Sequence, residues 1–157
     1  MDSKIKYING DATEPIGNGN KIIVHVCNDI GKWGRGFVMA LSRKWQAPRD
    51  EYRRWFKSKE EFELGEVQFV QVEDAIWIAN LIGQQNLTGD NFGKPPIRYE
   101  AVENGLNEVA LKAKELNASV HMPRIGCGLA GGEWKIMKEI IIKTLIANDI
   151  PTTVYDF

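Results

Sequence analysis

The sequence has few of the residues that would mark a metal-binding, disulfide-rich or membrane protein. Two cysteines and two histidines occur in 157 residues; they are too few for a disulfide framework and lack the spacing of a structural zinc site. No apolar run is long enough to span a membrane, and no signal peptide is evident. The net charge of −1 leaves no basic surplus for general binding to nucleic acid or acidic membranes. We therefore expect a cytoplasmic protein with reduced cysteines and no metal or cofactor.

The composition is that of an ordinary globular domain. Hydrophobic residues make up 43% and charged residues 26% of the sequence. A chain of this length buries roughly 70% of its unfolded surface on folding, which is enough for a core. The sequence shows no internal repeat, linker or low-complexity segment. These features predict a single domain over residues 1–157, expected to be a monomer.

The hydrophobic pattern alternates between strands and helices. Segment 22–27 is a nearly continuous apolar run rich in β-branched residues, which is typical of a central strand buried on both faces. Apolar residues at helical spacing predict helices that begin near residues 37, 48, 98 and 133, the last ending near residue 148. Further strands are predicted over 4–9, 66–72, 76–82, 118–122 and 152–155, with 66–72 and 76–82 forming a hairpin. This order predicts an α/β fold, a three-layer α/β/α sandwich around a mixed sheet of about six strands.

Basic residues are concentrated in the predicted helical region that follows the second strand. Segment Arg43–Lys59 holds seven basic and two acidic residues, a local excess of five positive charges. The favoured interpretation is a set of solvated helix faces, and the alternative is a surface for an acidic partner.

Two glycine-rich stretches each follow a predicted strand and precede a predicted helix. Four of the seven residues from Gly126 to Gly132 are glycine, and such a loop lets successive backbone N–H groups converge on phosphate oxygens. The second stretch, Asn28–Gly36, has the same setting. A tight structural connection would explain either loop alone. Because ligands of open α/β sheets bind outside the carboxyl ends of the strands, the pair of loops favours a cleft for an anionic ligand.

The polar segment Gln84–Pro96 is about 13 residues long, which is long for a loop in a compact domain. Loops of this length often act as lids over functional sites. The sequence leaves open whether this one is a lid or a surface insertion.

Four short segments carry a recognisable pattern. They are Gly10–Thr13 after the first predicted strand, Trp33–Phe37 after the second, Met122–Leu129, and the closing Thr153–Phe157. Together they resemble the macrodomain family, which binds ADP-ribose, and the similarity covers essentially the whole chain. The Pro-Arg-Ile-Gly-Cys-Gly run resembles the branch that contains the terminal ADP-ribose protein glycohydrolase and the macrodomain of a chromatin-remodelling helicase.

The resemblance implies a place for each part of ADP-ribose. Asp11 would accept a hydrogen bond from the adenine amino group and the Ala12 N–H would meet an adenine ring nitrogen, although Asp11 is alternatively a turn residue. Tyr155 or Phe157 would lie against adenine or, alternatively, pack in the core. Backbone amides would take the place of lysines at the phosphates of this nearly neutral protein. The loops at the distal ribose and the diphosphate would comprise Gly34, Arg35, Gly36, Ile125, Gly126, Cys127, Gly128 and Leu129.

This sequence lacks the catalytic residue types that the resemblance to that branch implies. The resemblance implies a lysine that attacks the distal ribose and an aspartate after the Gly-Cys-Gly-Leu run, yet these positions hold Gln84 or Gln85 and Ala130. Neither an amide nor a methyl group acts as nucleophile or base at neutral pH. The remaining route is hydrolysis by a water molecule that the site positions. Asn28 is the best placed polar side chain for this role, and Asp29 is a weaker candidate base. The alternative role of Asn28 is that of a turn residue.

Three functions are compatible with these residues. The favoured hypothesis is an ADP-ribosyl hydrolase that frees ADP-ribose from modified acidic side chains of proteins, or processes a derivative such as ADP-ribose 1-phosphate. The first alternative is a non-catalytic reader that binds ADP-ribose or ADP-ribosylated macromolecules, in keeping with the two altered catalytic positions. The second is a Cys-His hydrolase built from Cys127 with His25 or His121, for which no third orienting group is evident.

Overall fold

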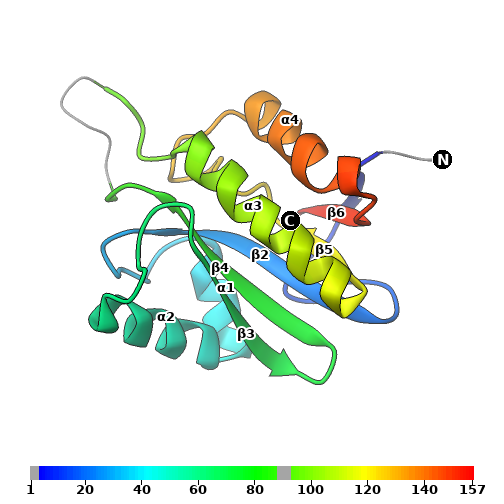
Figure 1. Ribbon diagram of the computed structural model, residues 1–157, viewed down its shortest axis with the longest axis horizontal. Coiled ribbons are helices and arrows are strands. Elements are labelled where there is room, and N and C mark those ends of the chain that lie inside the picture. The colour runs from blue at the N-terminus through cyan, green and yellow to red at the C-terminus, as the bar shows by residue number, and fades with distance from the viewer. Residues whose placement is uncertain (1–3, 88–92) are drawn as a thin grey trace.

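The computed structural model describes residues 4–87 and 93–157 and places six strands of this part of the chain in one sheet (Figure 1). The strands lie in the order β1-β6-β5-β2-β4-β3. β3 and β4 pair antiparallel and the other neighbouring pairs are parallel, so the predicted hairpin and mixed sheet are confirmed. The bounds are β1 Lys6–Asn9, β2 Asn20–Asn28, β3 Val67–Glu73, β4 Ile76–Gln84, β5 Ala118–Met122 and β6 Thr152–Asp156.

The described residues also form four α-helices, which cover the two faces of the sheet (Figure 1). Helices α1 and α2 lie on one face and pack through Leu41 and Tyr52 against Ile23 and Ile78 of the central strands. Helices α3 and α4 lie on the other face over a larger apolar cluster. The predicted three-layer α/β/α sandwich is confirmed. The bounds are α1 Phe37–Lys44, α2 Ala47–Ser58, α3 Tyr99–Leu116 and α4 Trp134–Thr144.

Strand β2 lies at the centre of the sheet because its apolar run has a helical layer on each side. Ile22, Ile23 and Val24 are fully buried. The strand pairs with β5 on one side and with β4 on the other, where Asn28 lies opposite Gln84. The carboxyl ends of these parallel strands therefore open at the same edge of the sheet, and the loops that follow them meet there.

The last helix is shorter than predicted. It ends at Thr144 rather than near residue 148, and a 3-10 turn spans Ile146–Asn148. The Asn148 amide donates to the Thr144 carbonyl at 2.8 Å, and Asp149 adopts a left-handed φ of 59°. Such side-chain bonds to the backbone compete with the α-helical pattern. Within the part of the chain that the structure describes, no helix is both long and apolar enough to cross a membrane.

Candidate functional site

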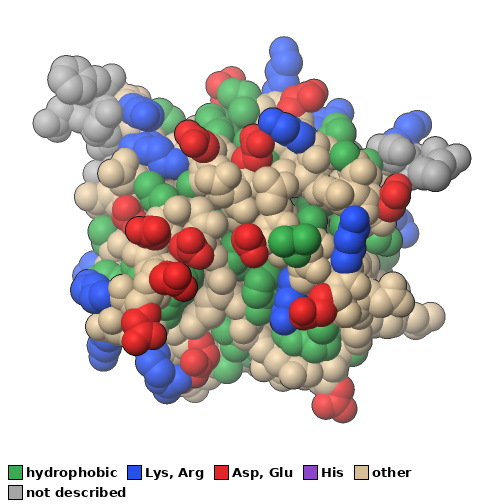
Figure 2. All heavy atoms as spheres, in the orientation of Figure 1, with side chains coloured by type: hydrophobic (Ala, Val, Ile, Leu, Met, Phe, Trp, Pro, Cys, Tyr) green, Lys and Arg blue, Asp and Glu red, His purple; other side chains and the backbone are tan. Residues whose placement is uncertain are grey.

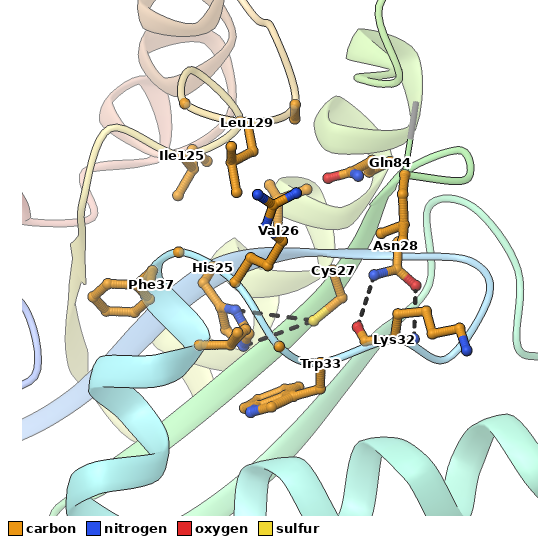
Figure 3. Close-up of a pocket in the computed structure, with 18 of the residues that line it drawn as sticks. His25, Val26, Cys27, Asn28, Lys32, Trp33, Phe37, Gln84, Ile125 and Leu129 are labelled. Carbon is orange, nitrogen blue, oxygen red and sulfur yellow. Dashed lines mark hydrogen bonds between the residues drawn. The ribbon is translucent and has the colours of Figure 1, made fainter. Parts of the chain in front are cut away.

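A cleft of about 640 Å³ opens at the carboxyl ends of β2 and β4 (Figure 3). Its walls are the loop after β2 and the loop after β5, so the two glycine-rich stretches do flank one cleft. His25 and Cys27 line its base, and Trp33 lines one side. Leu129 reaches toward the opposite loop, where a Cβ on Gly36 would lie 3.8 Å from it. A cavity of this size suits a small-molecule ligand.

The loop after β5 holds a shape that requires glycine at two positions. Gly126 has a φ of +69°, and a Cβ there would lie 2.6 Å from the side chain of Ile97. Gly132 donates its N–H to the Gly126 carbonyl at 2.7 Å, and a Cβ on Gly132 would lie 2.5 Å from that oxygen. The side chain of Ile125 is buried in the main core. The loop is therefore folded back on itself and anchored by contacts within the protein.

Several backbone N–H groups of this loop have no acceptor in the part of the chain that the structure describes. Among the described residues, no hydrogen bond takes the N–H of Gly126, Gly128 or Leu129, whereas Cys127 donates its N–H to the Arg124 carbonyl at 3.3 Å. Gly126, Gly128 and Leu129 all line the cleft. Unpaired N–H groups in a glycine-rich turn that leads into a helix are suited to an anion.

Asn28 ends β2 and organises the loop that follows it. Its Oδ1 accepts the N–H groups of Ile30 and Lys32, both at 3.1 Å, and its Nδ2 donates to the Lys32 carbonyl at 2.7 Å. The hydroxyl of Tyr52 lies 2.9 Å from the same Oδ1. These contacts are those of the turn role that was the alternative to catalysis. Because Asn28 also lines the cleft, its contact with a ligand stays a prediction.

The segment after β4 is bonded to the loop after β2. Asp29 Oδ1 accepts the N–H of Asn86 at 2.7 Å, and Asp29 is not among the cleft-lining residues. Gln84 lines the cleft and donates its Nε2 to the Asn86 carbonyl at 2.9 Å. Gln85 lines a second cavity instead, and its Oε1 accepts a bond from Arg98. Of the two positions considered for the missing lysine, Gln84 is therefore the one at the cleft.

The predicted lid segment is only partly described, because residues 88–92 lie outside the described ranges. Leu87 lines the cleft, and the N–H of Gln85 donates to the Pro96 carbonyl at 2.8 Å. Farther along, the N–H of Ile97 donates to the carbonyl of Ala130, the buried cleft residue at the expected aspartate position. These bonds fix the ends of the segment against the β4 end and the loop after β5.

Neither histidine is placed to activate Cys127. His25 Nε2 lies 2.5 Å from Asn80 Oδ1, and His121 Nδ1 lies 2.6 Å from the hydroxyl of Tyr155. Burial lowers the pKa of each histidine to about 4, so both rings are neutral at pH 7. Burial also raises the pKa of the Cys127 thiol. No hydrogen bond within the described residues joins Cys127 to either ring, which argues against the Cys-His hydrolase.

The residues predicted to hold adenine lie near the ends of β1 and β6. Asp11 Oδ1 accepts bonds from the N–H of Thr13 at 2.9 Å and from its hydroxyl at 2.8 Å, which are the contacts of a turn residue. Ala12 and Tyr155 are buried and Phe157 is fully exposed. These residues are not in the lining of the cleft described above, and their contact with adenine stays a prediction.

None of the known protein-family models matches the chain, but solved structures share its fold and much of its sequence. A Bacteroides thetaiotaomicron protein of unknown function is 59% identical, with a TM-score of 0.97 over 98% of both chains. A macrodomain protein from Streptomyces coelicolor is 50% identical, with a TM-score of 0.87 over 98% of this chain and 99% of that one. The chain belongs to the macrodomain family.

Curated relatives of this macrodomain have different sizes and names. Mus musculus chromodomain-helicase-DNA-binding protein 1-like is 34% identical over 100% of this chain, which spans only 18% of that protein. Lodderomyces elongisporus ADP-ribose 1''-phosphate phosphatase is 28% identical over 88% of this chain and 91% of its own length. Bos taurus ADP-ribose glycohydrolase is 29% identical over 98% of this chain and 91% of its own.

The cleft of this macrodomain carries more positive charge than we expected from the sequence. Its described lining holds no aspartate or glutamate and contains four basic residues, Lys32, Arg35, Arg53 and Arg124. We expected amide dipoles to replace lysines at the phosphates, but the fold adds cations to those amides. Arg53 belongs to the basic run Arg43–Lys59, so the charge excess of that run was the available signal.

Only one of these four cations is neutralised within the described residues. Arg124 donates to both carboxylate oxygens of Asp156, at 2.6 and 3.1 Å, and its guanidinium lies 4.8 Å from the ring centre of Trp134. Lys32, Arg35 and Arg53 form no ion pair in the described part of the chain. Three of the four cations in the cleft lining therefore have no carboxylate partner among the described residues.

Several acidic side chains lie near one another outside the described cleft lining. Figure 2 shows a group of them on the face in view. Burial and the neighbouring Glu61, Glu63 and Glu108 raise the pKa of Glu66, and none of these four residues lines the cleft. Within the described ranges, no set of three or more His, Cys, Asp or Glu side chains is arranged to hold a metal ion.

Proposed function

We propose that this macrodomain binds ADP-ribose in the cleft between its two glycine-rich loops. The observation that carries the proposal is the set of N–H groups at Gly126, Gly128 and Leu129 that have no acceptor among the described residues, in a cleft whose described lining holds four cations and no carboxylate. Such a site attracts the diphosphate of a nucleotide sugar. The names of the fungal and bovine relatives, both of which concern ADP-ribose, support the same ligand.

The order of the strands suggests how ADP-ribose lies across the sheet. The diphosphate meets the loop after β5, and the distal ribose lies over the ends of β2 and β4 beside Asn28 and Gln84. Adenine then extends past β6 toward β1, where Asp11 and Ala12 follow the strand. This placement follows the family resemblance, which implies Asp11 and Ala12 at adenine and the loop after β5 at the diphosphate.

The proposed reaction is hydrolysis of the bond between C1 of the distal ribose and a protein carboxylate. Water forms the new C1–O bond, the carboxylate leaves with the electrons of the broken bond, and the proton of the water passes to solvent. The leaving group is stable as an anion, and a site that positions water promotes such a step without a protein nucleophile. The diphosphate of the ligand orients the water, because the described lining offers no carboxylate for that task.

The second candidate is a reader that binds ADP-ribose without cleaving it. Two observations favour it: Ala130 occupies the expected aspartate position, and Asp29 is bonded to Asn86 outside the cleft lining. Both proposals share the same binding site and differ only in turnover.

One assay separates the hydrolase from the reader. The protein is incubated with a peptide ADP-ribosylated on glutamate, and free ADP-ribose is measured by chromatography. The hydrolase proposal predicts many equivalents of ADP-ribose per protein molecule, and none from Gly126→Glu protein prepared in parallel. Binding of the modified peptide with no release at stoichiometric protein would overturn the hydrolase and support the reader.

A further inference from the structure

The segment that joins β1 to β2, residues 10–19, carries both residues expected at the adenine amino group and ring nitrogen. Asp11 is partly exposed, and Ala12 is buried. The Oδ1 atom of Asp11 accepts the N–H and the hydroxyl of Thr13, whereas no described residue donates a hydrogen bond to its Oδ2 atom. The turn role of Asp11 therefore leaves one carboxylate oxygen for a donor from a ligand.

Lys44 fixes the first half of this segment. Its Nζ, in the last turn of α1, donates to the Thr13 carbonyl at 2.7 Å. Thr13 is buried, and it donates its N–H and its hydroxyl to Asp11 Oδ1 at 2.9 and 2.8 Å. Two successive residues, Lys44 and Thr13, therefore connect α1 to the carboxylate of Asp11.

Tyr155 fixes the second half of the segment from the sheet. Its hydroxyl, on β6, accepts the N–H of Ile16 at 3.0 Å. The same hydroxyl lies 2.6 Å from His121 Nδ1 on β5, and both side chains are buried, which holds the phenol in place. Residues 16–19 are all exposed, so this bond ties a solvent-facing stretch of backbone to the core.

We infer that Lys44 and Tyr155 are positioning residues that make the site selective for a base with an exocyclic amino group. They hold residues 13–16 from two sides, so the Asp11 carboxylate keeps one orientation. Because a carboxylate only accepts hydrogen bonds, a fixed Asp11 favours an amino group over a carbonyl oxygen on the base. A carboxylate that turns freely loses this discrimination. The inference rests on the proposed binding of ADP-ribose and adds two residues that act on the ligand only through this segment.

Calorimetric titration compares ADP-ribose with its hypoxanthine analogue, in which a carbonyl oxygen replaces the amino group of the base. The wild-type protein should bind ADP-ribose at least about tenfold more tightly. Lys44→Met and Tyr155→Phe should each reduce this preference to less than about threefold, mainly through weaker binding of ADP-ribose. Lys44→Arg should retain the preference, because a guanidinium also donates to the Thr13 carbonyl.

Two matched variants separate positioning from a general effect on charge or stability. Arg43→Met removes the exposed cation next to Lys44 on α1, which forms no ion pair within the described residues. Tyr99→Phe removes a hydroxyl that also accepts a backbone N–H, that of Glu133 at 2.9 Å. Both variants should keep the base preference, with thermal melting confirming that each is folded. Because Lys44 is partly exposed, Lys44→Met carries the test if Tyr155→Phe does not fold.

The outcomes distinguish this positioning role from the binding site itself. Equal affinity of the wild-type protein for the two ligands would overturn the inference, because Asp11 would then not select the base, while ADP-ribose binding stands. A preference that survives in Lys44→Met or in Tyr155→Phe would overturn the role of that residue. Loss of the preference in either matched variant would also overturn the inference, because the effect would then be general. Binding of neither ligand by the wild-type protein would overturn the proposed function as well.

Discussion

The hydroxyl of Tyr52 on α2 lies 2.6 Å from the backbone carbonyl oxygen of Asn28 and 2.9 Å from its side-chain Oδ1. Both residues are buried, and burial is the main cause that raises the pKa of Tyr52, so the phenol stays protonated and donates. A helix on one face of the sheet thereby holds the loop that forms one wall of the cleft.

Replacing Tyr52 with phenylalanine should weaken both the fold and the site. The Tyr52→Phe variant leaves the Asn28 oxygens without this donor and should lower the free energy of unfolding by about 1–3 kcal/mol. The loop after β2 should loosen, which weakens ADP-ribose binding by roughly threefold. Urea denaturation and calorimetry measure the two effects. Unchanged stability would contradict the role given to this contact.

Gly31 makes a second contact between the same loop and α2. It has a φ of +74°, and a Cβ there would lie 2.5 Å from the ring of Phe56. Gly31→Ala should therefore lower the free energy of unfolding by about 2–3 kcal/mol, from backbone strain and the steric clash together. In a Gly31→Ala/Phe56→Ala double variant the clash is absent. The double variant should therefore lose less unfolding free energy than the sum of the losses measured for the two single variants. Strict additivity of the two losses would contradict the packing described here.

The histidines predict how stability depends on pH. The folded-state pKa of His25 and of His121 is lowered to about 4, from 6.5, chiefly by burial. The unfolded chain therefore takes up protons first as the pH falls, and stability is lost between about pH 6.5 and pH 4. Each histidine should contribute a loss of about 2 kcal/mol between pH 7 and pH 5.

The His121→Gln variant isolates one of these contributions. Between about pH 7 and pH 5, the free energy of unfolding should decrease in this variant as well. The decrease should be about 2 kcal/mol smaller than in the wild type. Urea denaturation at the two pH values gives the comparison. Parallel pH profiles for the variant and the wild type would show that burial of neutral His121 does not contribute.

Cys127 should not be a nucleophile. Burial raises the pKa of its thiol, so the thiolate is scarce at neutral pH, and neither histidine is bonded to it. If the protein releases ADP-ribose from a modified peptide, Cys127→Ala should retain that activity within about threefold. A fall of about a hundredfold with an intact fold would restore the thiol mechanism.

The sequence predicted the structure best at positions where a single physical requirement restricts which residues can be present. The apolar, β-branched run of 22–27 is typical of a strand covered on both faces, and the structure places β2 at the centre. The glycine-rich stretches located the cleft because positive φ and close backbone approach exclude other residues at Gly126. The predicted end of α4 was wrong because the helix end depends on side-chain hydrogen bonds of Thr144 and Asn148. The spacing of hydrophobic residues carries no information about these bonds.

The chemistry of the site was less accessible from the sequence. An asparagine after a strand suits a turn and a catalytic site equally well, and only the bonds of Asn28 show the turn role. Helical spacing shows which face of α2 is buried, but it does not show that Arg53 lines a cleft. That depends on how α2 packs on β3 and β4, which is set by long-range contacts such as that of Asn80 with the Pro48 carbonyl.

Calorimetric titration with ADP-ribose tests the central claim most directly. The wild-type protein should bind one equivalent in the micromolar range, about −8 kcal/mol. Gly126→Glu should abolish binding, because it places bulk and negative charge where the loop has a φ of +69° and no space beside Ile97. Leu111→Glu, which adds the same charge at an exposed position on α3, should bind normally, with thermal melting confirming that each variant is folded. Wild-type protein that does not bind ADP-ribose at millimolar concentration would contradict the account.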